Sequence, residues 1–386
     1  MPKNKPTMNI CKAWIITDGK AGMEVQVLGV ARALEAVFEI KHVHPRGLWR
    51  LLAPWGPIDP QERFGRDGSQ FAPPWPDIAL ATGRLSIPAL RAVRKASPKT
   101  YTVIIQDPRT GAGAADLIAV PAHDALSGEN VIQTLTAPHG FSQHRLAQLR
   151  RNLPKEIAAL PEPRVAVVLG GPNSIYPFSE EDSARLGGAL ASMATLGASF
   201  LVTSSRRTPP HTLNAVLEAT QTSRRIVWDG KESSNSAAVG QTNTSSNSAA
   251  VGQTNTSSNS AAIGQTNTSS NSEAIGQTNT SSNSEAAGQT ENPNPYESWL
   301  AHADMFVVTA DSINMTGEAC ASGKPVYVFE PKGGSAKFMR FHESLRRYGA
   351  TRKLPDSFSQ LEKWTYAPLD SASQIAAEIQ KRWRKY

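Results

Sequence analysis

Three segments of this chain carry the residue types that bind phosphate. Gly170-Gly171-Pro172-Asn173 and Thr203-Ser204-Ser205-Arg206-Arg207 each end an apolar run, and Asp311-Ser312-Ile313-Asn314 opens a helical pattern. Glycine lets a ligand approach the backbone, a helix N-terminus presents N–H groups and partial positive charge, and arginine makes bidentate phosphate contacts. Together the three segments predict a site for a diphosphate-bearing ligand.

The third segment gives this prediction its detail. Ser312 or Asn314 would cap a helix that starts near Ile313 and leave N–H groups facing a phosphate. Glu318, one to two turns along, would accept hydrogen bonds from ribose hydroxyls, and the small residues around it permit close approach. In the alternative interpretation, Ser312 is only a helix cap and Glu318 is a solvated helix residue.

A second set of polar loops follows apolar runs in the first half of the chain. These are Asp18-Gly19-Lys20-Ala21-Gly22, Thr82-Gly83-Arg84, Gln106-Asp107-Pro108-Arg109 and Val120-Pro121-Ala122-His123-Asp124. An acid or a histidine in such a loop is a candidate general base, and Asp18 and the His123–Asp124 pair are the candidates here. Alternatively, Asp18 only shapes a glycine turn, and neighbouring residues 123 and 124 need not face each other.

The elements that must position these loops alternate between strand and helix. In the first half we expect strands at 14–17, 40–44, 77–83, 102–106 and 117–120, with helices at 27–38 and 86–95. In the second half we expect strands at 164–169, 199–203, 225–228 and 305–309, with helices from 179, 208–220, 296–303 and from 313. This pattern predicts an α/β fold with two Rossmann-like domains facing across a cleft. Ligands of such sheets bind at the carboxyl ends of the strands.

Composition shifts suggest where the domains begin and end. The first domain would cover 8–153 and the second 164–370, with the proline-rich stretch 154–163 as a hinge and a helix at 371–386 packing back. Residues 233–290 repeat a 12-residue unit, SSNSAAVGQTNT. Such polar repeats bury too little apolar surface to offset ordering entropy, so we expect a disordered insertion in a surface loop. The alternative is a polar β-solenoid.

The overall composition narrows the class of protein. The chain has 386 residues, 39% of them hydrophobic, and a net charge of +7, which favours anionic partners. We find no apolar run that could span a bilayer and no signal or transit pattern, and so predict a cytoplasmic, bacterial protein. No Asp-x-Asp pair or zinc spacing of histidines occurs, so we expect no metal and no cofactor. No nucleic-acid-binding module is recognisable.

The stretch His44-Pro45-Arg46-Gly47-Leu48-Trp49-Arg50-Leu51-Leu52-Ala53-Pro54-Trp55 alternates aromatic and basic residues with leucines. It would suit peripheral contact with the cytoplasmic face of an anionic inner membrane. The alternative is a loop tucked against the first domain.

A family resemblance supports the phosphate-site prediction for the three segments in the second half of the chain. Asp311-Ser312-Ile313-Asn314-Met315-Thr316-Gly317-Glu318-Ala319, with Gly323-Lys324-Pro325-Val326, resembles the donor-nucleotide segment of two-domain (GT-B) glycosyltransferases. With Thr17 to Gly22, Gln26, the loops at 106–109, 120–124 and 170–173, and Ser204 to Thr208, the chain resembles the "elongated mitochondria" fission family and its bacterial relatives, often described as glycosyltransferases.

The resemblance implies inverting, metal-independent transfer of a sugar from a nucleotide-diphosphate donor to a cell-envelope saccharide or lipid-linked acceptor. Arg206 or Lys332 would stabilise the departing diphosphate, and Asp18, His123 and Asp124 are the catalytic candidates. The donor-binding set would be Gly170, Gly171, Asn173, Ser205, Arg206, Ser312, Asn314, Met315, Glu318 and Lys332. The acceptor-side set would be Gly19, Lys20, Gly22, Arg84, Asp107 and Arg109.

One residue departs from the expected pattern. Lipid-linked muramyl-type transferases carry a histidine at the end of a glycine-rich turn, where this chain has Met23. Methionine cannot accept a proton, so the base has moved to Asp18 or His123, or catalysis is lost. The alternative function is therefore a catalytically silent scaffold that binds a nucleotide sugar or a protein partner.

Overall fold

In the computed structural model, which describes residues 11–124, 126–229 and 294–384, the strands form two parallel six-stranded sheets. The first sheet has the order β2-β1-β3-β4-β5-β6. Its strands are β1 (Lys12–Thr17), β2 (Val37–His42), β3 (Ile78–Thr82), β4 (Tyr101–Ile105), β5 (Leu117–Pro121) and β6 (Val131–Thr134). Every residue of β3, β4 and β5 is buried, because helices cover both faces of this sheet.

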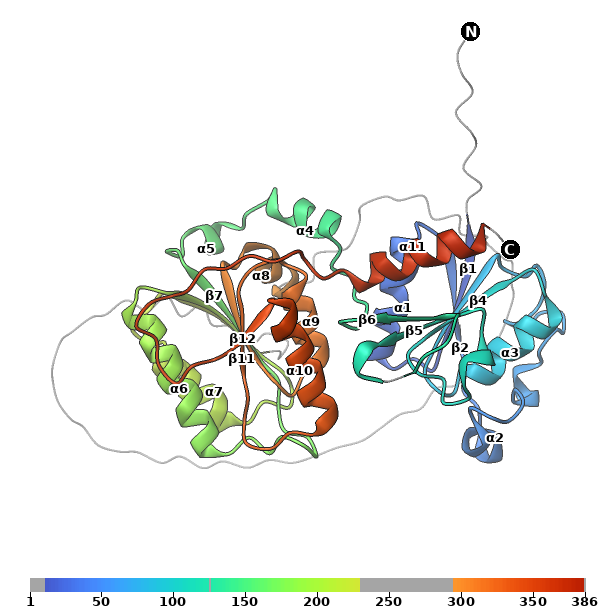
Figure 1. The fold of residues 1–386 in the computed structure, drawn as a ribbon, viewed down its shortest axis with the longest axis horizontal. Coiled ribbons are helices and arrows are strands. Elements are labelled where there is room, and N and C mark those ends of the chain that lie inside the picture. The colour runs from blue at the N-terminus through green and yellow to red at the C-terminus, as the bar shows by residue number, and fades with distance from the viewer. Residues whose placement is uncertain (1–10, 125, 230–293, 385–386) are drawn as a thin grey trace, which may run out of the picture. The chain divides into compact units, whose positions relative to one another are not determined.

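Alternate strand residues build two cores, one on each face of the first sheet. Ile15, Leu80 and Val103 point to the side covered by α1 (Ala21–Ala33) and α11 (Ser371–Trp383). Trp14 and Ile104 point to the side covered by α3 (Ile87–Ala96). Figure 1 shows these helices on opposite faces of the sheet. Because successive side chains of a strand point to opposite faces of the sheet, alternate residues form one apolar layer on each face.

The second sheet has the order β12-β11-β10-β7-β8-β9. Its strands are β7 (Arg164–Leu169), β8 (Ser199–Ser204), β9 (Arg225–Trp228), β10 (Met305–Thr309), β11 (Val326–Phe329) and β12 (Thr351–Lys353). One face is covered by α6 (Glu180–Thr195) and α7 (Pro210–Ala219). The other packs against α8 (Tyr296–His302), α9 (Ile313–Cys320) and α10 (Ala336–Tyr348), as Figure 1 also shows.

These strand orders confirm the predicted α/β class with two Rossmann-like sheets. In each sheet the order reverses at one point, between β1 and β3 in the first sheet and between β7 and β10 in the second. In open parallel sheets of this kind, ligands bind at the carboxyl ends of the strands beside such a switch point. Asp18 follows β1, and the loops that begin at Gly170 and Ala310 follow β7 and β10.

Two stretches differ from the expected elements. The helical spacing predicted a helix to residue 38, but α1 ends at Ala33 and Glu35 takes a left-handed φ of 53°. That turn lets β2 begin at Val37, three residues before the predicted strand. Short or polar elements were not predicted. They are α2 (Gly47–Leu52), α4 (Gln143–Arg150), α5 (Lys155–Ala158), β6, β12, α10, and the 3-10 turns η1 (Pro60–Glu62), η2 (Ala112–Ala114) and η3 (Ala122–Asp124).

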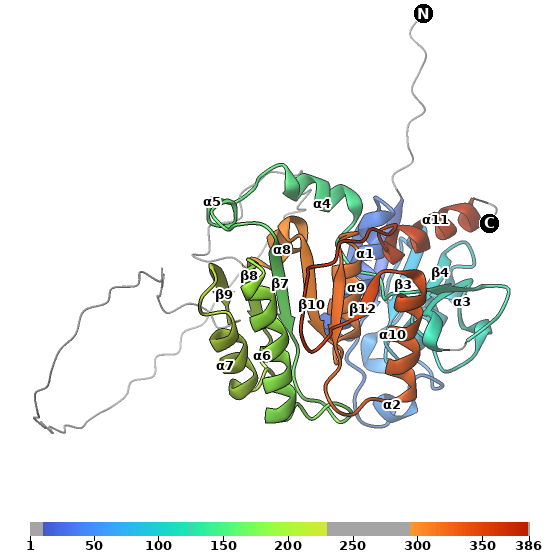
Figure 2. The ribbon, with the colours of Figure 1, turned by 60° about the vertical axis from the view of Figure 1, so that its left-hand side comes forward.

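The chain passes between the two sheets twice. Leu146 of α4 and Ile157 of α5 pack in a core of the second sheet, so the first passage precedes the proline-rich stretch. The chain returns through α11, which lies beside α1 in Figures 1 and 2. Asp370 caps α11 by accepting a hydrogen bond from the Ser373 backbone N–H. The buried hydroxyls of Thr136 and Ser371 lie 2.7 Å apart where the two passages meet.

The repeat at 233–290 lies outside the described residues. Both sheets and all described helices belong to one compact unit of the chain.

Candidate functional site

The second switch point is a tight cradle of backbone and one buried acid. The Gly170 N–H donates to Thr309 Oγ1 at 2.8 Å, and the Gly171 N–H donates to Asp311 Oδ2 at 3.0 Å. A Cβ on Gly170 would lie 2.1 Å from Asp311 Oδ2, and one on Gly171 would lie 2.3 Å from the Arg207 carbonyl oxygen. Real Cβ atoms do not approach so closely, so both positions require glycine in this arrangement.

Asp311 is the acid in this cradle. Its side chain is fully buried, and Oδ1 has no hydrogen-bond partner among the described residues. Burial raises the pKa of this carboxyl, against the lowering effect of its hydrogen bonds and of the Arg207 guanidinium, which lies 3.9 Å from Oδ2. An orphaned buried oxygen marks a place where a further hydrogen-bond donor would be stabilised.

The N-terminus of α9 begins beside Asp311. Ser312 is the cap, since its Oγ accepts a hydrogen bond from the Met315 N–H at 3.3 Å. The other cap candidate, Asn314, is exposed instead. A helix start leaves four N–H groups without intrahelical partners, and this cap occupies one of them. The loop between β10 and α9 thus combines a helix dipole with the glycine cradle.

A cavity of about 200 Å³ adjoins α9 on the side facing α1. Its walls include Gly22 and Gln26 from α1, His139, and Asn314 and Glu318 from α9. A Cβ on Gly22 would lie 3.8 Å from Asn314 Nδ2, so the two helices approach closely here. The cavity therefore takes its walls from residues on both sides of the chain passage.

Glu318 is the ionisable group in this cavity. Burial raises the pKa of its carboxyl to about 7, and a 2.8 Å hydrogen bond from the Tyr296 hydroxyl to Oε2 opposes that rise. Near pH 7 the group exchanges its proton readily, so it can donate or accept a hydrogen bond. The sequence did not indicate Tyr296, which arrives from the helix after the repeat.

His139 is a second residue that the sequence did not indicate. It is 3% exposed, its Nδ1 accepts from the Phe141 N–H at 3.3 Å, and Nε2 has no hydrogen-bond partner among the described residues. Burial lowers the pKa of this imidazole, which is therefore neutral near pH 7. A Cβ on Gly29 would lie 2.5 Å from the His139 carbonyl oxygen, so α1 packs directly against this backbone.

The first switch point has a different chemical character. Asp18 Oδ2 lies 2.6 Å from Lys20 Nζ, while Oδ1 is buried with no partner among the described residues. Opposite it, Gly83 takes a φ of 81°, and a Cβ there would lie 3.1 Å from Met23 Sδ. Met23 thus lies next to Asp18 and Gly83, where it offers a thioether and no proton acceptor.

Gln106 connects the β4 loop to α1. It has a φ of 84°, and its Nε2 donates to Gln26 Oε1 at 2.9 Å. Both glutamines belong to the segments that carried the family resemblance, but neither was assigned to the site. Asp107 Oδ1 accepts from the Arg109 N–H at 2.8 Å, so this acid shapes its own loop.

Several predicted site residues already have protein partners. Arg84 donates to the Ala53 carbonyl at 2.8 Å, and Asn173 Oδ1 accepts from the backbone N–H groups of Ile175 and Tyr176. Lys332 pairs with Glu181, and the Ser205 hydroxyl lies 3.1 Å from that of Thr208. Gly19 follows Asp18 with a φ of 76°, and Arg206 is exposed on the loop after β8.

The predicted His123–Asp124 pair is described only in part. Asp124 Oδ1 lies 2.6 Å from Lys337 Nζ on α10, which gives this carboxylate a cation partner from the second sheet's side. The side chain of His123 lies outside the described part of the structure. Among the described residues, no group of three or more His, Cys, Asp or Glu is placed to hold a metal ion.

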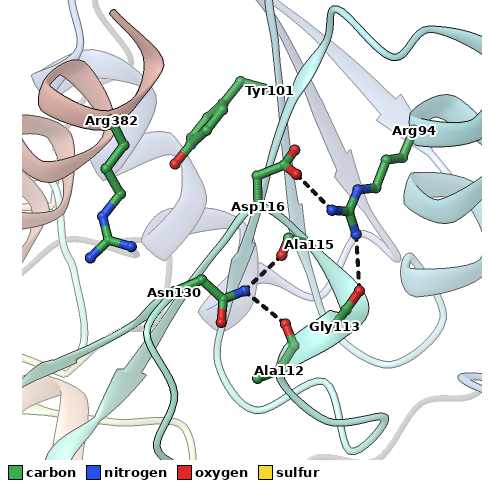
Figure 3. Close-up of a pocket in the computed structure, with 8 residues that line it drawn as sticks. All are labelled: Arg94, Tyr101, Ala112, Gly113, Ala115, Asp116, Asn130 and Arg382. Atoms are coloured by element: carbon green, nitrogen blue, oxygen red, sulfur yellow. Dashed lines mark hydrogen bonds and ion pairs between the residues drawn. The ribbon is translucent and has the colours of Figure 1, made fainter. Parts of the chain in front are cut away.

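A larger cavity, of about 540 Å³, lies elsewhere, where β4 and β5 begin. Figure 3 shows that two of its polar side chains are already paired within the cavity: Arg94 contacts Asp116 and the Gly113 carbonyl, and Asn130 donates to the Ala112 and Ala115 carbonyls. Arg382 on its rim pairs with Glu378 and the Glu129 carbonyl. Because this cavity is at the amino ends of the strands and these side chains already have partners, the switch points remain the better candidate site.

Residues 21–251 and 253–383 match the family model described as Mitochondrial fission ELM1. The chain belongs to this family. The match begins just after the Asp18–Lys20 loop of the first switch point, includes the second switch point and extends over most of the chain, which confirms the expected family resemblance.

Two curated relatives extend this ELM1 assignment. The chain is 24% identical over 331 residues to Mitochondrial fission protein ELM1 of Arabidopsis thaliana, covering 79% of this chain but only 64% of the plant protein. It is 23% identical over 407 residues to an uncharacterized protein of Rickettsia prowazekii, covering 96% of this chain and 98% of that one.

Solved structures give a weaker likeness for this ELM1 family member. UDP-GlcNAc 2-epimerase of Methanocaldococcus jannaschii is 9% identical with a TM-score of 0.46, over 96% of this chain and 99% of that one. MurG of Acinetobacter baumannii is 12% identical with a TM-score of 0.43, over 97% and 95%. Likeness at this level says nothing about what this chain binds. No helix of the described residues is long and apolar enough to cross a bilayer.

Proposed function

We propose that this ELM1 family member is an inverting, metal-independent glycosyltransferase. It would move a sugar from a nucleotide-diphosphate donor to a cell-envelope saccharide or glycolipid, at the cytoplasmic side of the membrane. The observation that carries this proposal is the second switch point, where the Gly170–Gly171 turn meets the N-terminus of α9 beside a cavity containing Glu318.

The second switch point has the chemistry that a diphosphate needs. The Gly170 and Gly171 N–H groups already donate to Thr309 and Asp311, so the diphosphate would bind at the start of α9, which adds partial positive charge. Arg206 and Arg207 are exposed on the neighbouring loop after β8 and add positive charge, with the Arg207 guanidinium 3.9 Å from Asp311 Oδ2. Lys332 would join them only by giving up its ion pair with Glu181.

Glu318 suits a ligand that carries hydroxyl groups. Its pKa of about 7 lets the carboxyl accept from or donate to a ribose hydroxyl, while Tyr296 holds the other side of the group. The cavity of about 200 Å³ is smaller than the roughly 300–1,000 Å³ of sites for drug-sized ligands. It would enclose one sugar ring, with the rest of the donor along the open loops.

The acceptor would bind at the carboxyl ends of the first sheet, with Asp18 as general base. The unpartnered Oδ1 is the atom that would take the acceptor proton, and Lys20 holds the other carboxylate oxygen. Gly19, Gly22, Asp107 and Arg109 border the same edge of the sheet.

A second candidate function is a scaffold that binds a nucleotide sugar, or a protein partner, without turnover. It is favoured by Met23, which lies beside Gly83 and Asp18 and cannot accept a proton. The plant relative, named for mitochondrial fission, is compatible with a binding role.

A ligand panel separates the candidates. The full chain is screened by thermal shift against UDP-, GDP-, ADP- and CMP-sugars, and each stabilising sugar is then followed for transfer and hydrolysis. A ligand at 100 times its Kd should add about 2.7 kcal/mol to the free energy of unfolding. Binding with transfer supports the enzyme, and binding without turnover supports the scaffold. If none of the panel binds, the enzyme and the nucleotide-sugar scaffold are both wrong, and only a scaffold for a protein partner remains.

Two variants localise the binding. Glu318→Gln should weaken the binding of the stabilising ligand. Glu297→Gln, at an exposed glutamate on helix α8, should leave that binding unchanged. Equal binding by both variants would exclude Glu318 from the site.

A further inference from the structure

Helix α2 carries its apolar stripe on the outside. Leu48 is 62% exposed, Leu51 74% and Trp55 64%, and no residue of α2 is buried. Leu48, Leu51 and Leu52 have the i, i+3, i+4 spacing of one helix face. In a helix of a soluble domain such a stripe normally faces the core. Figure 1 shows α2 standing away from the first sheet, at the periphery of the fold.

The opposite side of this segment already makes the contacts with the domain. Ala53 is 1% exposed, and Trp49 lines a small internal space together with Val43, Pro57 and Pro88. The outward leucines are therefore not a misplaced core face, because another set of residues fills that role.

Two arginines fix the segment in place. Arg84 donates to the Ala53 carbonyl at 2.8 Å, and Arg91 donates to the carbonyls of Pro54 at 2.8 Å, Trp55 at 2.9 Å and Gly56. Arg84 lies in the loop after β3, a central strand of the first sheet, and Arg91 lies in α3, which packs on that sheet. The exposed side chains thus stand on a backbone that is tied to the domain.

The charge around the stripe is positive. Arg46 and Arg50 are exposed within the segment, and α2 has no acidic residue in its first turn. The nearest acids in sequence, Asp59 and Glu62, are engaged by the backbone N–H groups of Arg46 and His44. Residues 46–55 therefore carry leucine, tryptophan and arginine side chains and no carboxylate of their own.

We propose that the α2 surface, defined as Arg46, Leu48, Arg50, Leu51, Leu52 and Trp55, docks onto an anionic lipid bilayer. Leucine and tryptophan side chains flanked by arginine suit insertion at the headgroup boundary, with the cations on the lipid phosphates. A six-residue helix offers less area than the roughly 800 Å² per partner that a stable protein interface buries, which argues against a second copy.

The position of the α2 surface indicates which part of the protein membrane docking would bring to the bilayer. It follows β2, so it leaves the first sheet at the same carboxyl edge as Asp18, and Arg84 ties it to the loop after β3. Membrane docking would bring that edge to the lipid surface. The docking inference does not depend on the proposed transfer reaction, because it is read from α2 alone.

Vesicle co-sedimentation of the full chain tests the inference. The protein should bind phosphatidylcholine vesicles that contain phosphatidylglycerol, bind pure phosphatidylcholine vesicles at least about tenfold less, and release as salt is raised. Light scattering of the free protein across concentrations shows whether the surface binds a second copy instead.

Matched variants assign the binding to the α2 surface. L48S/L51S/W55S should lower the affinity for anionic vesicles by at least about tenfold, and R46Q/R50Q by about tenfold. The controls are V227S/L196S, exposed apolar residues beside the second sheet, and R151Q/R347Q, exposed arginines elsewhere. All four should keep the thermal midpoint of the wild type, because every changed side chain is exposed.

The inference is overturned if the wild type ignores anionic vesicles, or if the triple variant binds them as the wild type does. It is also overturned if the free protein dimerises and L48S/L51S/W55S abolishes the dimer, since the occupant would then be a second copy.

Discussion

The two switch points of this chain share a topology and differ in chemistry. At the second, Gly170 and Gly171 leave only backbone beside a fully buried Asp311 and the capped start of α9. At the first, Asp18 is tied to Lys20, and Met23 lies beside Gly83. Each of the two acids keeps one buried carboxylate oxygen without a hydrogen-bond partner among the described residues, so the feature that favours an anion at the second switch point is the capped N-terminus of α9.

The two candidate functions make different demands on the two switch points. Binding of a diphosphate needs only the second switch point, while chemistry on an acceptor needs the first as well. A scaffold and an enzyme would therefore share the binding of the diphosphate at the second switch point and differ in the chemistry at the first. The following variants test that contrast, from the largest expected effect to the smallest.

Gly170→Ala should have the largest effect. The new Cβ would lie 2.1 Å from Asp311 Oδ2, and Asp311 has no room to move, so we expect a loss of about 2 to 4 kcal/mol in the free energy of unfolding. In Gly83→Ala the new Cβ would contact mainly the flexible end of Met23. Because Gly83 has a φ of 81°, we expect this substitution to lower the free energy of unfolding by about 1 kcal/mol. Urea unfolding measures both.

Gly113→Ala is the control for these two substitutions, because nothing lies within 4 Å of its Cβ position. If Gly170→Ala proves no more costly than Gly83→Ala, the cradle is looser than described and the contrast between the switch points fails.

Glu318→Gln should change stability in a pH-dependent way. The folded pKa is about 7 and the ordinary value is 4.5, so the stability from protonated Glu318 is full below pH 4.5 and lost as pH rises through 7. Glutamine is neutral throughout, so the variant should match the wild type near pH 4 and exceed it by about 2 kcal/mol at pH 8. Thermal or urea unfolding at both pH values measures this.

The control is Glu297→Gln, at an exposed glutamate, which should change stability by less than about 0.5 kcal/mol at either pH. A Glu318→Gln variant that is never more stable than the wild type would show that this carboxyl is solvated.

Ser312→Ala should cost about 1 kcal/mol, because it removes the cap on the Met315 N–H. Ser335→Ala removes the corresponding cap on α10 and should cost the same. Calorimetric titration with the stabilising nucleotide sugar should separate them, since only the α9 cap adjoins the proposed diphosphate position. Equal affinity in both variants would move the ligand away from α9.

Asp18→Asn should have the smallest effect on stability, less than about 1 kcal/mol, because its partner Lys20 is largely exposed to water. Donor binding should be unchanged. If Asp18 is the base, turnover should fall at least about a hundredfold, whereas Asp107→Asn, at a loop-shaping acid on the same lobe, should retain it. Retained turnover in Asp18→Asn would assign the base elsewhere.

The sequence predicted most of the fold because the central strands are apolar in continuous runs. The strand at 164–169 and the helix start at Ser179 appear in the structure at the predicted residues. Elements missed in the prediction, such as β6 and β12, are short or partly exposed and carry a weak apolar signal. The left-handed turn at Glu35 ends α1 early, and it could not be predicted because no glycine occupies that position.

The candidate site was predictable only where one segment contained it. Gly170, Gly171, Ser312 and Glu318 each lie in a loop or helix whose residue types pointed to phosphate or hydroxyl groups. Tyr296 and His139 could not be found in this way, because Tyr296 contacts Glu318 from the preceding helix and His139 lines the cavity from the first half of the chain. Likewise, nothing in the sequence showed that Asp124 pairs with Lys337, or that Asn173 folds back on its own loop.

Hydrogen–deuterium exchange with bound ligand tests the central claim most directly. On saturation with the nucleotide sugar that stabilises the chain most, we expect slowed exchange at the amides of Gly170, Gly171 and 313–316, with residues 18–22 much less affected. Protection confined to the first switch point, or to the cavity around Arg94 and Asp116, would contradict the assignment of the diphosphate to the second sheet.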